Sequence, residues 1–174
     1  MARRSPLDRY SVTQNYIMTR GQALTFPSKY FKMKLKPDEV YGVVIDMPMG
    51  NSILTTMVSF LNGATNLYFN MGGEYSGASQ RYVNLVQATR TLVLYANSLL
   101  PQCQKVKAFD LPTGNKHFIY LLTNNGVYKT ELLPATIAQE SPEKRGVFNL
   151  YQKVLSEVRT CQLKDQQASR NKNK

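Results

Sequence analysis

The stretch ILTTMVSFLNGATNLYFNMGGEYSG, residues 53–77, decides the fold of this chain. It contains two runs rich in β-branched and aromatic residues, 53–61 and 64–70, which are typical of strands. Between them lies Asn62-Gly63, the dipeptide that best fits a two-residue hairpin turn. The stretch therefore predicts an antiparallel hairpin, followed by a glycine-rich loop over 71–77.

The segments on either side extend this pattern. Upstream, 40–47 (VYGVVIDM) is the strongest strand pattern of the chain, and Pro48 interrupts it because proline cannot donate to a strand ladder. Downstream, the apolar period changes from two to about 3.6 residues, which predicts an amphipathic helix over 79–100. Ser79 is a candidate cap for that helix, and Pro101 ends it.

The rest of the chain repeats the arrangement of strands followed by a helix. Residues 117–123 and 127–133 are strand patterns around a tight turn, and 105–111 is a further strand or an extended connection. Ser141-Pro142-Glu143 has the residue order of a helix start. A short helix is also compatible with the spacing of apolar residues in 10–24.

Together these elements predict an α+β domain. We expect a single, mostly antiparallel sheet of about five to six strands with two main helices packed on it, in the order β-β-β-α-β-β-β-α. The folded domain should span 10–163. Residues 1–9 are expected to be a flexible basic N-terminus. The periodic pattern is lost at Lys164, so 164–174 is expected to be a disordered basic tail.

The positive charge is concentrated at the two ends of the chain. The net charge is +11, yet residues 1–36 hold eight basic residues against one acid, and 164–174 hold four against one. The stretch between these ends is nearly neutral. One candidate function is therefore weak binding of nucleic acid or another polyanion through the terminal segments.

A second basic feature is the run KYFKMKLK at 29–36, in which Lys32, Lys34 and Lys36 alternate with apolar residues. In an extended chain this spacing places three ammonium groups on one face. The pattern favours an edge segment whose lysines discourage edge-to-edge pairing. The alternative is that these three lysines form a polyanion-binding surface.

The glycine-rich loop is the candidate site for a small anionic ligand or nucleotide. The candidate residues are Gly72, Gly73, Ser76, Gly77 and Arg81. The loop lies between a strand and an expected helix N-terminus, where free backbone N–H groups can hold a phosphate or carboxylate and the arginine can partner it. It matches neither GxGxxG nor GxxxxGK[ST], and Glu74 inside it would repel an anion. We favour the purely structural interpretation, in which the glycines only allow a tight turn.

The remaining ionisable groups suggest little chemistry. The chain has two cysteines, Cys103 and Cys161, without CxxC spacing, and a single histidine, His117. These are too few for a metal site, so we expect no metal and no cofactor. We expect two reduced thiols, and a single bridge between them is the alternative. His117 is interpreted as a surface residue, and Asp46 as a cap of the turn that ends its strand. No apolar run reaches about 18 residues and no signal sequence is visible, which predicts a cytoplasmic protein without membrane contact.

The run GATNLYFNMGGEYSG at 63–77 resembles the signature of a family of small, uncharacterised bacterial proteins, in which a strand ends in Leu-Tyr-Phe-Ser before a glycine run and a helix. Residues 23–26, 40–43 and 118–131 resemble further parts of that family in the same order. The resemblance spans roughly 16–160. It implies that the segment before the first strand belongs to the folded domain, and it implies no assigned activity.

Three functions are compatible with these patterns. The first is a non-enzymatic protein-interaction module, including self-association, because no catalytic constellation is recognisable and the edge strands of a sheet can pair with a partner. The second is nucleic-acid or polyanion binding through the basic ends. The third is a small-ligand site at the glycine-rich loop. We rank them in that order.

Overall fold

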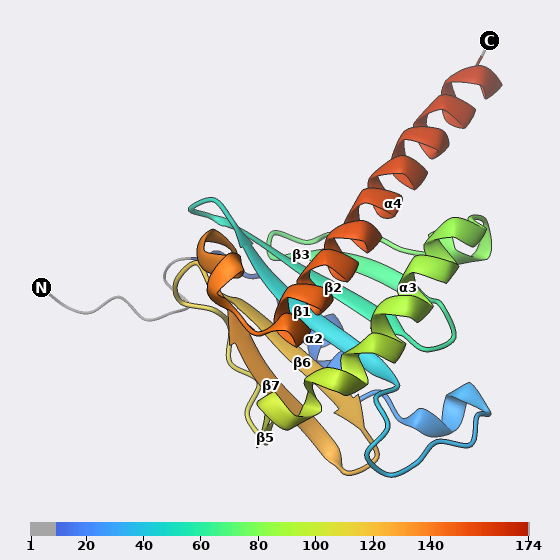
Figure 1. The fold of residues 1–174 in the computed structure, drawn as a ribbon. Coiled ribbons are helices and arrows are strands. Elements are labelled where there is room, and N and C mark those ends of the chain that lie inside the picture. The colour runs from blue at the N-terminus through green and yellow to red at the C-terminus, as the bar shows by residue number, and fades with distance from the viewer. Residues whose placement is uncertain (1–9, 174) are drawn as a thin grey trace, which may run out of the picture.

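A computed structural model describes residues 10–173 and shows an open antiparallel sheet (Figure 1). The strands lie in the order β4-β3-β2-β1-β6-β7-β5. Their bounds are β1 (Gly42–Met49), β2 (Ile53–Phe60), β3 (Thr65–Phe69), β4 (Gly73–Tyr75), β5 (Gln104–Val106), β6 (His117–Thr123) and β7 (Gly126–Leu132). The predicted α+β class and antiparallel sheet are confirmed. The sheet within residues 10–173 has seven strands instead of five to six, because the glycine-rich loop itself contributes β4.

Helices cover both faces of the sheet. The helices α3 (Val83–Tyr95) and α4 (Pro142–Lys172) pack on one face, and α2 (Gln14–Leu24) lies on the other (Figure 1). Short 3₁₀ segments connect these elements: η1 (Ser28–Phe31), η2 (Ala78–Gln80), η3 (Ala96–Gln102) and η4 (Pro134–Gln139). The helix predicted over 79–100 is thus α-helical only in its middle, and residues 81–82 separate it from η2. The interpretation of Ser79 as its cap is wrong, because Tyr82 is the N-cap of α3 and Ser79 Oγ accepts from the Thr65 N–H.

The central strand β1 explains why 40–47 reads as a nearly continuous apolar run. Val43 and Ile45 pack into the core under α3 and α4, whereas Val44 packs into the core beside α2. A strand that is buried on both faces needs apolar residues at successive positions. A hairpin at Asn62-Gly63 is also present, with Ser59 opposite Thr65 in the register of β2 and β3. Its turn is not the expected two-residue type, because the Phe60 N–H donates to the Ala64 carbonyl and only Gly63 of the pair has a positive φ.

The lysine-rich run 29–36 does not form the expected extended segment. Its first part lies in η1, and Lys32 has a φ of 51°, which is left-handed backbone. A left-handed residue breaks the period-two alternation, so the three lysines do not share one face of a strand. Lys32, Lys34 and Lys36 are exposed in the irregular chain before β1.

The helix α4 continues to Lys172, beyond the point where the sequence pattern predicts a disordered tail. Figure 1 shows its last turns projecting past the sheet and the other helices. Residues 166–173 are exposed on every side of the helix. The prediction of a flexible N-terminus at 1–9 lies outside the described residues, as does Lys174.

Candidate functional site

The glycine-rich loop forms a second hairpin instead of a cradle at a helix N-terminus. β4 pairs with β3, with Gly73 opposite Phe69. Gly72 and Gly77 have φ values of 108° and 75°, a backbone region that glycine adopts without steric cost. Ser76 is exposed at the end of β4, and only the three-residue η2 follows the loop before α3. The glycines therefore serve the chain reversals at the two ends of β4.

Arg81 faces an anion that the chain itself supplies. Its Nη2 donates to Asp165 Oδ2 at 2.7 Å, and the hydroxyls of Tyr75 and Tyr82 donate to the same carboxylate at 2.6 and 2.5 Å. These hydrogen bonds, that of Tyr75 first, hold the pKa of Asp165 down to about 2. The structure thus brings Arg81 together with Gly77, whose carbonyl it also contacts at 3.3 Å, but not with Gly72 and Gly73 at the other end of β4. Binding of an external anion at this loop stays a prediction, and such an anion would have to share Arg81 with Asp165 or take its place.

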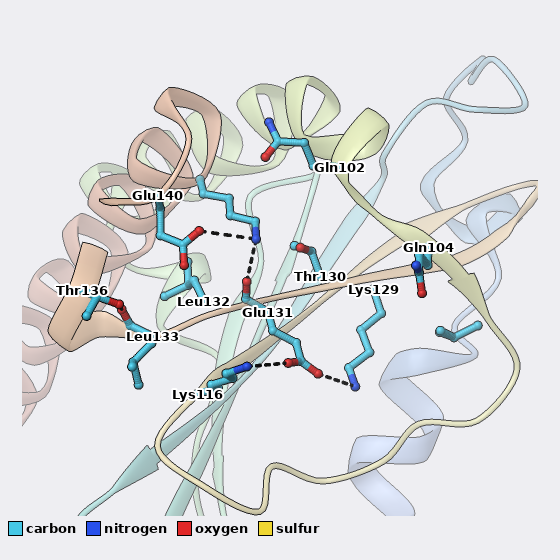
Figure 2. A pocket seen from close by; sticks show the side chains of 12 residues that line it. Gln102, Gln104, Lys116, Lys129, Thr130, Glu131, Leu132, Leu133, Thr136 and Glu140 are labelled. Atoms are coloured by element: carbon cyan, nitrogen blue, oxygen red, sulfur yellow. Dashed lines mark hydrogen bonds and ion pairs between the residues drawn. The ribbon is translucent and has the colours of Figure 1, made fainter. Parts of the chain in front are cut away.

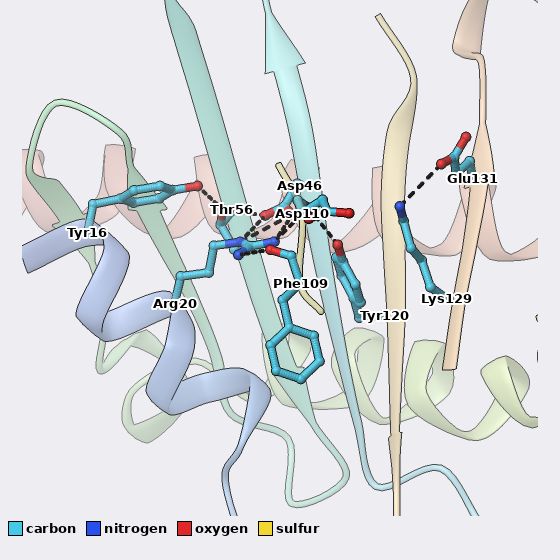
Figure 3. A network of polar contacts seen from close by, with 9 residues as sticks. All are labelled: Tyr16, Arg20, Asp46, Thr56, Phe109, Asp110, Tyr120, Lys129 and Glu131. Atoms are coloured by element: carbon cyan, nitrogen blue, oxygen red, sulfur yellow. Dashed lines mark hydrogen bonds and ion pairs between the residues drawn. The ribbon is translucent and has the colours of Figure 1, made fainter. Parts of the chain in front are cut away.

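A buried polar network ties α2 to the sheet (Figure 3). Asp46 is fully buried within β1, so its interpretation as a turn cap is wrong. Arg20 donates to both of its carboxylate oxygens, through Nε at 3.0 Å and Nη2 at 2.7 Å, and Thr56 Oγ1 donates to Oδ1 at 2.7 Å. The Tyr16 hydroxyl shares a hydrogen bond with Thr56 at 2.6 Å. A carboxylate in an apolar strand requires such partners, because burial of an unpaired charge is very costly.

The same arginine also holds the irregular chain that precedes β6. Arg20 Nη1 donates to the Phe109 carbonyl at 2.9 Å, and Nη2 donates to the Asp110 carbonyl at 3.2 Å. The Tyr120 hydroxyl donates to the Asp110 carbonyl as well, at 2.6 Å. The network therefore uses its charged groups to join three segments far apart in sequence, and the side chains of both charged groups, Arg20 and Asp46, are buried.

His117 is buried, so its interpretation as a surface residue is wrong. Its Nδ1 lies 2.7 Å from the Tyr151 hydroxyl, which joins β6 to α4. Burial lowers the pKa of His117 to about 4, and the imidazole is neutral at physiological pH. The two buried side chains thus satisfy each other's hydrogen bonding, and both belong to the packing between α4 and the sheet.

A charged hollow of about 580 Å³ opens at the edge of β7, beside η4 and the start of α4 (Figure 2). Glu131 bridges two lysines, with its carboxylate 3.7 Å from Lys116 Nζ and 3.2 Å from Lys129 Nζ. Lys144 Nζ lies 3.5 Å from the Glu140 carboxylate and donates to the Glu131 carbonyl at 2.9 Å. Three ammonium groups thus meet two carboxylates in this hollow. Sequence reasoning missed it, because its residues come from separate segments and form no motif.

The end of α4 is exposed and basic. We call it the α4 basic end, and it consists of Arg159, Lys164, Arg170 and Lys172. Arg159, Arg170 and Lys172 make no ion pair with any residue in the range 10–173. The acids nearby are already paired: Glu157 lies 3.5 Å from Lys153, and Asp165 binds Arg81. The cations of this surface are therefore not neutralised by their own helix.

Within the described residues, no group of three or more His, Cys, Asp or Glu side chains could hold a metal ion, and no helix has the length and apolar character to cross a membrane. Cys103 and Cys161 are free thiols. The chain matches no protein-family model, no curated protein and no solved structure. The resemblance to a bacterial family therefore stays a prediction, and the proposals below rest on geometry alone.

Proposed function

We propose that this protein binds nucleic acid with the α4 basic end. One observation carries the proposal: the segment expected to be a loose tail is a helix that projects from the body, with cations that the protein does not neutralise. A fixed helix presents its charges at set spacings, so it loses less conformational entropy on binding than a disordered tail would.

The composition of this helix end suits a nucleic acid better than a membrane. Residues 162–172 span about 16 Å, and an α-helix about 10–12 Å wide fits the major groove of duplex DNA. Arginine and lysine bind phosphates, while the amides of Gln166, Gln167 and Asn171 are groups that can read base edges. An interfacial membrane helix needs a continuous apolar face. Between 162 and 172 the only large apolar side chain exposed is Leu163.

Protein interaction through the sheet edges, the function that the sequence ranked first, has weaker geometric support. Both edge strands, β4 and β5, are only three residues long. Short edges offer few unpaired backbone groups to a partner strand, and natural proteins use them to prevent edge-to-edge association. A protein partner and self-association remain predictions. A cytoplasmic location is part of the present proposal, and the two free thiols support it.

The test is a salt titration of DNA binding by the full-length protein. Fluorescence anisotropy with a labelled duplex of about 20 base pairs would compare the wild type with the triple variant Arg159→Gln/Arg170→Gln/Lys172→Gln. Each lost phosphate contact should reduce the slope of log affinity against log salt by about 0.9, so we expect the slope to fall by up to about 3.

The matched control is Lys32→Gln/Lys34→Gln/Lys36→Gln, which removes the same charge from exposed residues elsewhere. It also tests whether those three lysines form the polyanion-binding surface that the sequence offered as an alternative. We expect this control to keep most of the wild-type slope. An equal loss in both triple variants would mean that net charge alone drives binding, and a loss confined to the control would place the site at the lysine run. Either result would overturn the proposal.

A further inference from the structure

We infer that the charged hollow at the β7 edge is a binding site for the oxyanion of a small molecule, a carboxylate or a phosphate. This inference does not depend on nucleic-acid binding, because the hollow and the α4 basic end share no residue. Its volume of about 580 Å³ lies in the range of small-molecule sites, about 300–1,000 Å³.

The hollow exists because β5 covers only part of its neighbour. β5 lies opposite 127–129 of β7, and no residue of β5 lies opposite Glu131. Backbone groups in an antiparallel ladder point alternately toward each neighbour, and the Glu131 carbonyl accepts from Lys144 on the side away from β6. The N–H of Glu131 points to that same side, so the open edge offers a backbone donor to a ligand oxygen.

The lysines of the hollow are held in place before any ligand binds. The side chains of Lys129 and Lys144 are 17% and 19% exposed, which is low for lysine. Lys129 Nζ lies 3.6 Å from the centre of the Phe118 ring, and Lys144 Nζ is fixed by its contacts to Glu140 and to the Glu131 carbonyl. Each ammonium carries three N–H groups, and fixed donors bind an anion with little loss of entropy.

Glu131 shows what kind of group the hollow accepts. Its carboxylate, itself 37% exposed, lies between the ammonium groups of Lys116 and Lys129. A carboxylate or phosphate of a ligand would make the same charge-assisted hydrogen bonds, either beside Glu131 or in its place. Three ammonium groups against two carboxylates leave one positive charge for the ligand. The side chains of Val106 and Leu133 provide apolar wall for a short carbon chain.

The experiment uses two probes, inorganic phosphate and glutarate, titrated to millimolar concentration into the full-length protein with amide chemical shifts as the readout. The two probes distinguish a phosphate ligand from a carboxylate ligand. We expect saturable shifts at residues of the hollow, including Glu131 and Lys144, with at least one probe. Lys116→Gln, a change at a side chain that is 57% exposed, should weaken that binding about tenfold.

Glu131→Gln is the decisive variant, because it removes the internal carboxylate that competes for Lys116 and Lys129. It should strengthen binding of the same probe about tenfold. Glu157→Gln makes the same change of charge on α4, outside the hollow, and should leave the affinity within about twofold. If both variants bound the probe equally more tightly, net charge alone would explain the effect, and the inference would be overturned. Absence of saturable shifts with both probes, in the wild type and in Glu131→Gln, would overturn it as well.

Discussion

Arg81 Nη2 donates to Asp165 Oδ2 across 2.7 Å, and this bond joins the segment before α3 to the last third of α4. The same carboxylate accepts from the hydroxyls of Tyr75 and Tyr82. Cys161, one turn earlier in α4, is the last buried residue of that helix. Asp165 is therefore the point at which α4 is last attached to the body before it projects into solvent.

Replacement of Asp165 should release the end of α4. In Asp165→Asn the charge-assisted bonds to Arg81 and the two tyrosines are lost or weakened, so we expect faster amide hydrogen exchange over 162–172 with little change in the core strands. Glu157→Gln is the matched control, since it removes one charge and one ion pair from the same helix. Unchanged amide exchange in Asp165→Asn would show that the end of α4 is a stable helix without this contact.

The same attachment should be lost in acid. The folded-state pKa of Asp165 is lowered from 3.8 to about 2, so its contribution is fully present above about pH 4 and is lost as the pH falls toward 2. Carbon chemical shifts of 162–172, measured from pH 5 to pH 2, should report a loss of helix in the wild type. Asp165→Asn should show no such pH-dependent loss, and an equal loss in both proteins would contradict the assignment to this carboxylate.

The structure differs from the disordered tail predicted at 164–174 for a physical reason. Apolar periodicity predicts α4 correctly as far as its buried face extends, and it ends near Cys161 because no further residue is buried. Beyond that residue the helix is attached by a polar contact between segments 84 residues apart, and no local pattern reports such a contact. The sequence predicted Arg81 as the partner of a ligand anion. In the structure Arg81 binds Asp165, and ligand binding by Arg81 stays a prediction.

The fold class, the Asn-Gly hairpin and the core strand β1 could be predicted because each depends on local periodicity and turn chemistry. The position of Asp46 in an apolar strand was informative, but it was interpreted as a turn cap. A carboxylate in an apolar strand implies a buried partner, and Arg20 in the preceding helix was available. The hollow at β7 carried no signal, since Lys116, Lys129 and Lys144 come to line one hollow only after the sheet and α4 have packed.

The buried pair of Arg20 and Asp46 should be far more important for stability than any ion pair on the surface. Asp46→Asn leaves the Arg20 guanidinium, 7% exposed, without its counterion, and we expect a loss of about 3–5 kcal/mol in the free energy of unfolding. Arg20→Met should cost a similar amount, because it leaves the carboxylate buried. Urea denaturation of the two variants would measure both losses.

A double-mutant cycle separates the pair from its surroundings. The double variant Arg20→Met/Asp46→Leu should lose less than the two single losses added together, because no unpaired charge stays buried. The same cycle on the exposed pair of Lys153 and Glu157 should give a coupling below about 1 kcal/mol. Strict additivity at Arg20 and Asp46 would show that the two groups do not stabilise each other.

His117 should make the fold sensitive to mild acid. Its folded-state pKa of about 4 lies below its usual 6.5, so the unfolded chain takes up the proton first. The free energy of unfolding should therefore decrease as the pH falls from about 6.5 to about 4, by at most about 3 kcal/mol. His117 is the only histidine of the chain, and His117→Gln should remove this slope. A slope that persists in the variant would assign the effect to other groups.

Two glycines should respond in opposite directions to the same substitution. Gly63 has a φ of 95°, and a Cβ at this position would clash with the Val86 side chain of α3. Gly63→Ala should therefore destabilise the fold by about 2–4 kcal/mol, since strain in the turn adds to overpacking against α3.

Gly21 lies inside α2, and a Cβ there meets no heavy atom within 4 Å. Gly21→Ala should stabilise the protein by about 0.5–1 kcal/mol, because alanine favours the helix and restricts the unfolded chain. Thermal unfolding of both variants tests this pair, and destabilisation by Gly21→Ala would show that α2 needs the freedom of glycine at this turn.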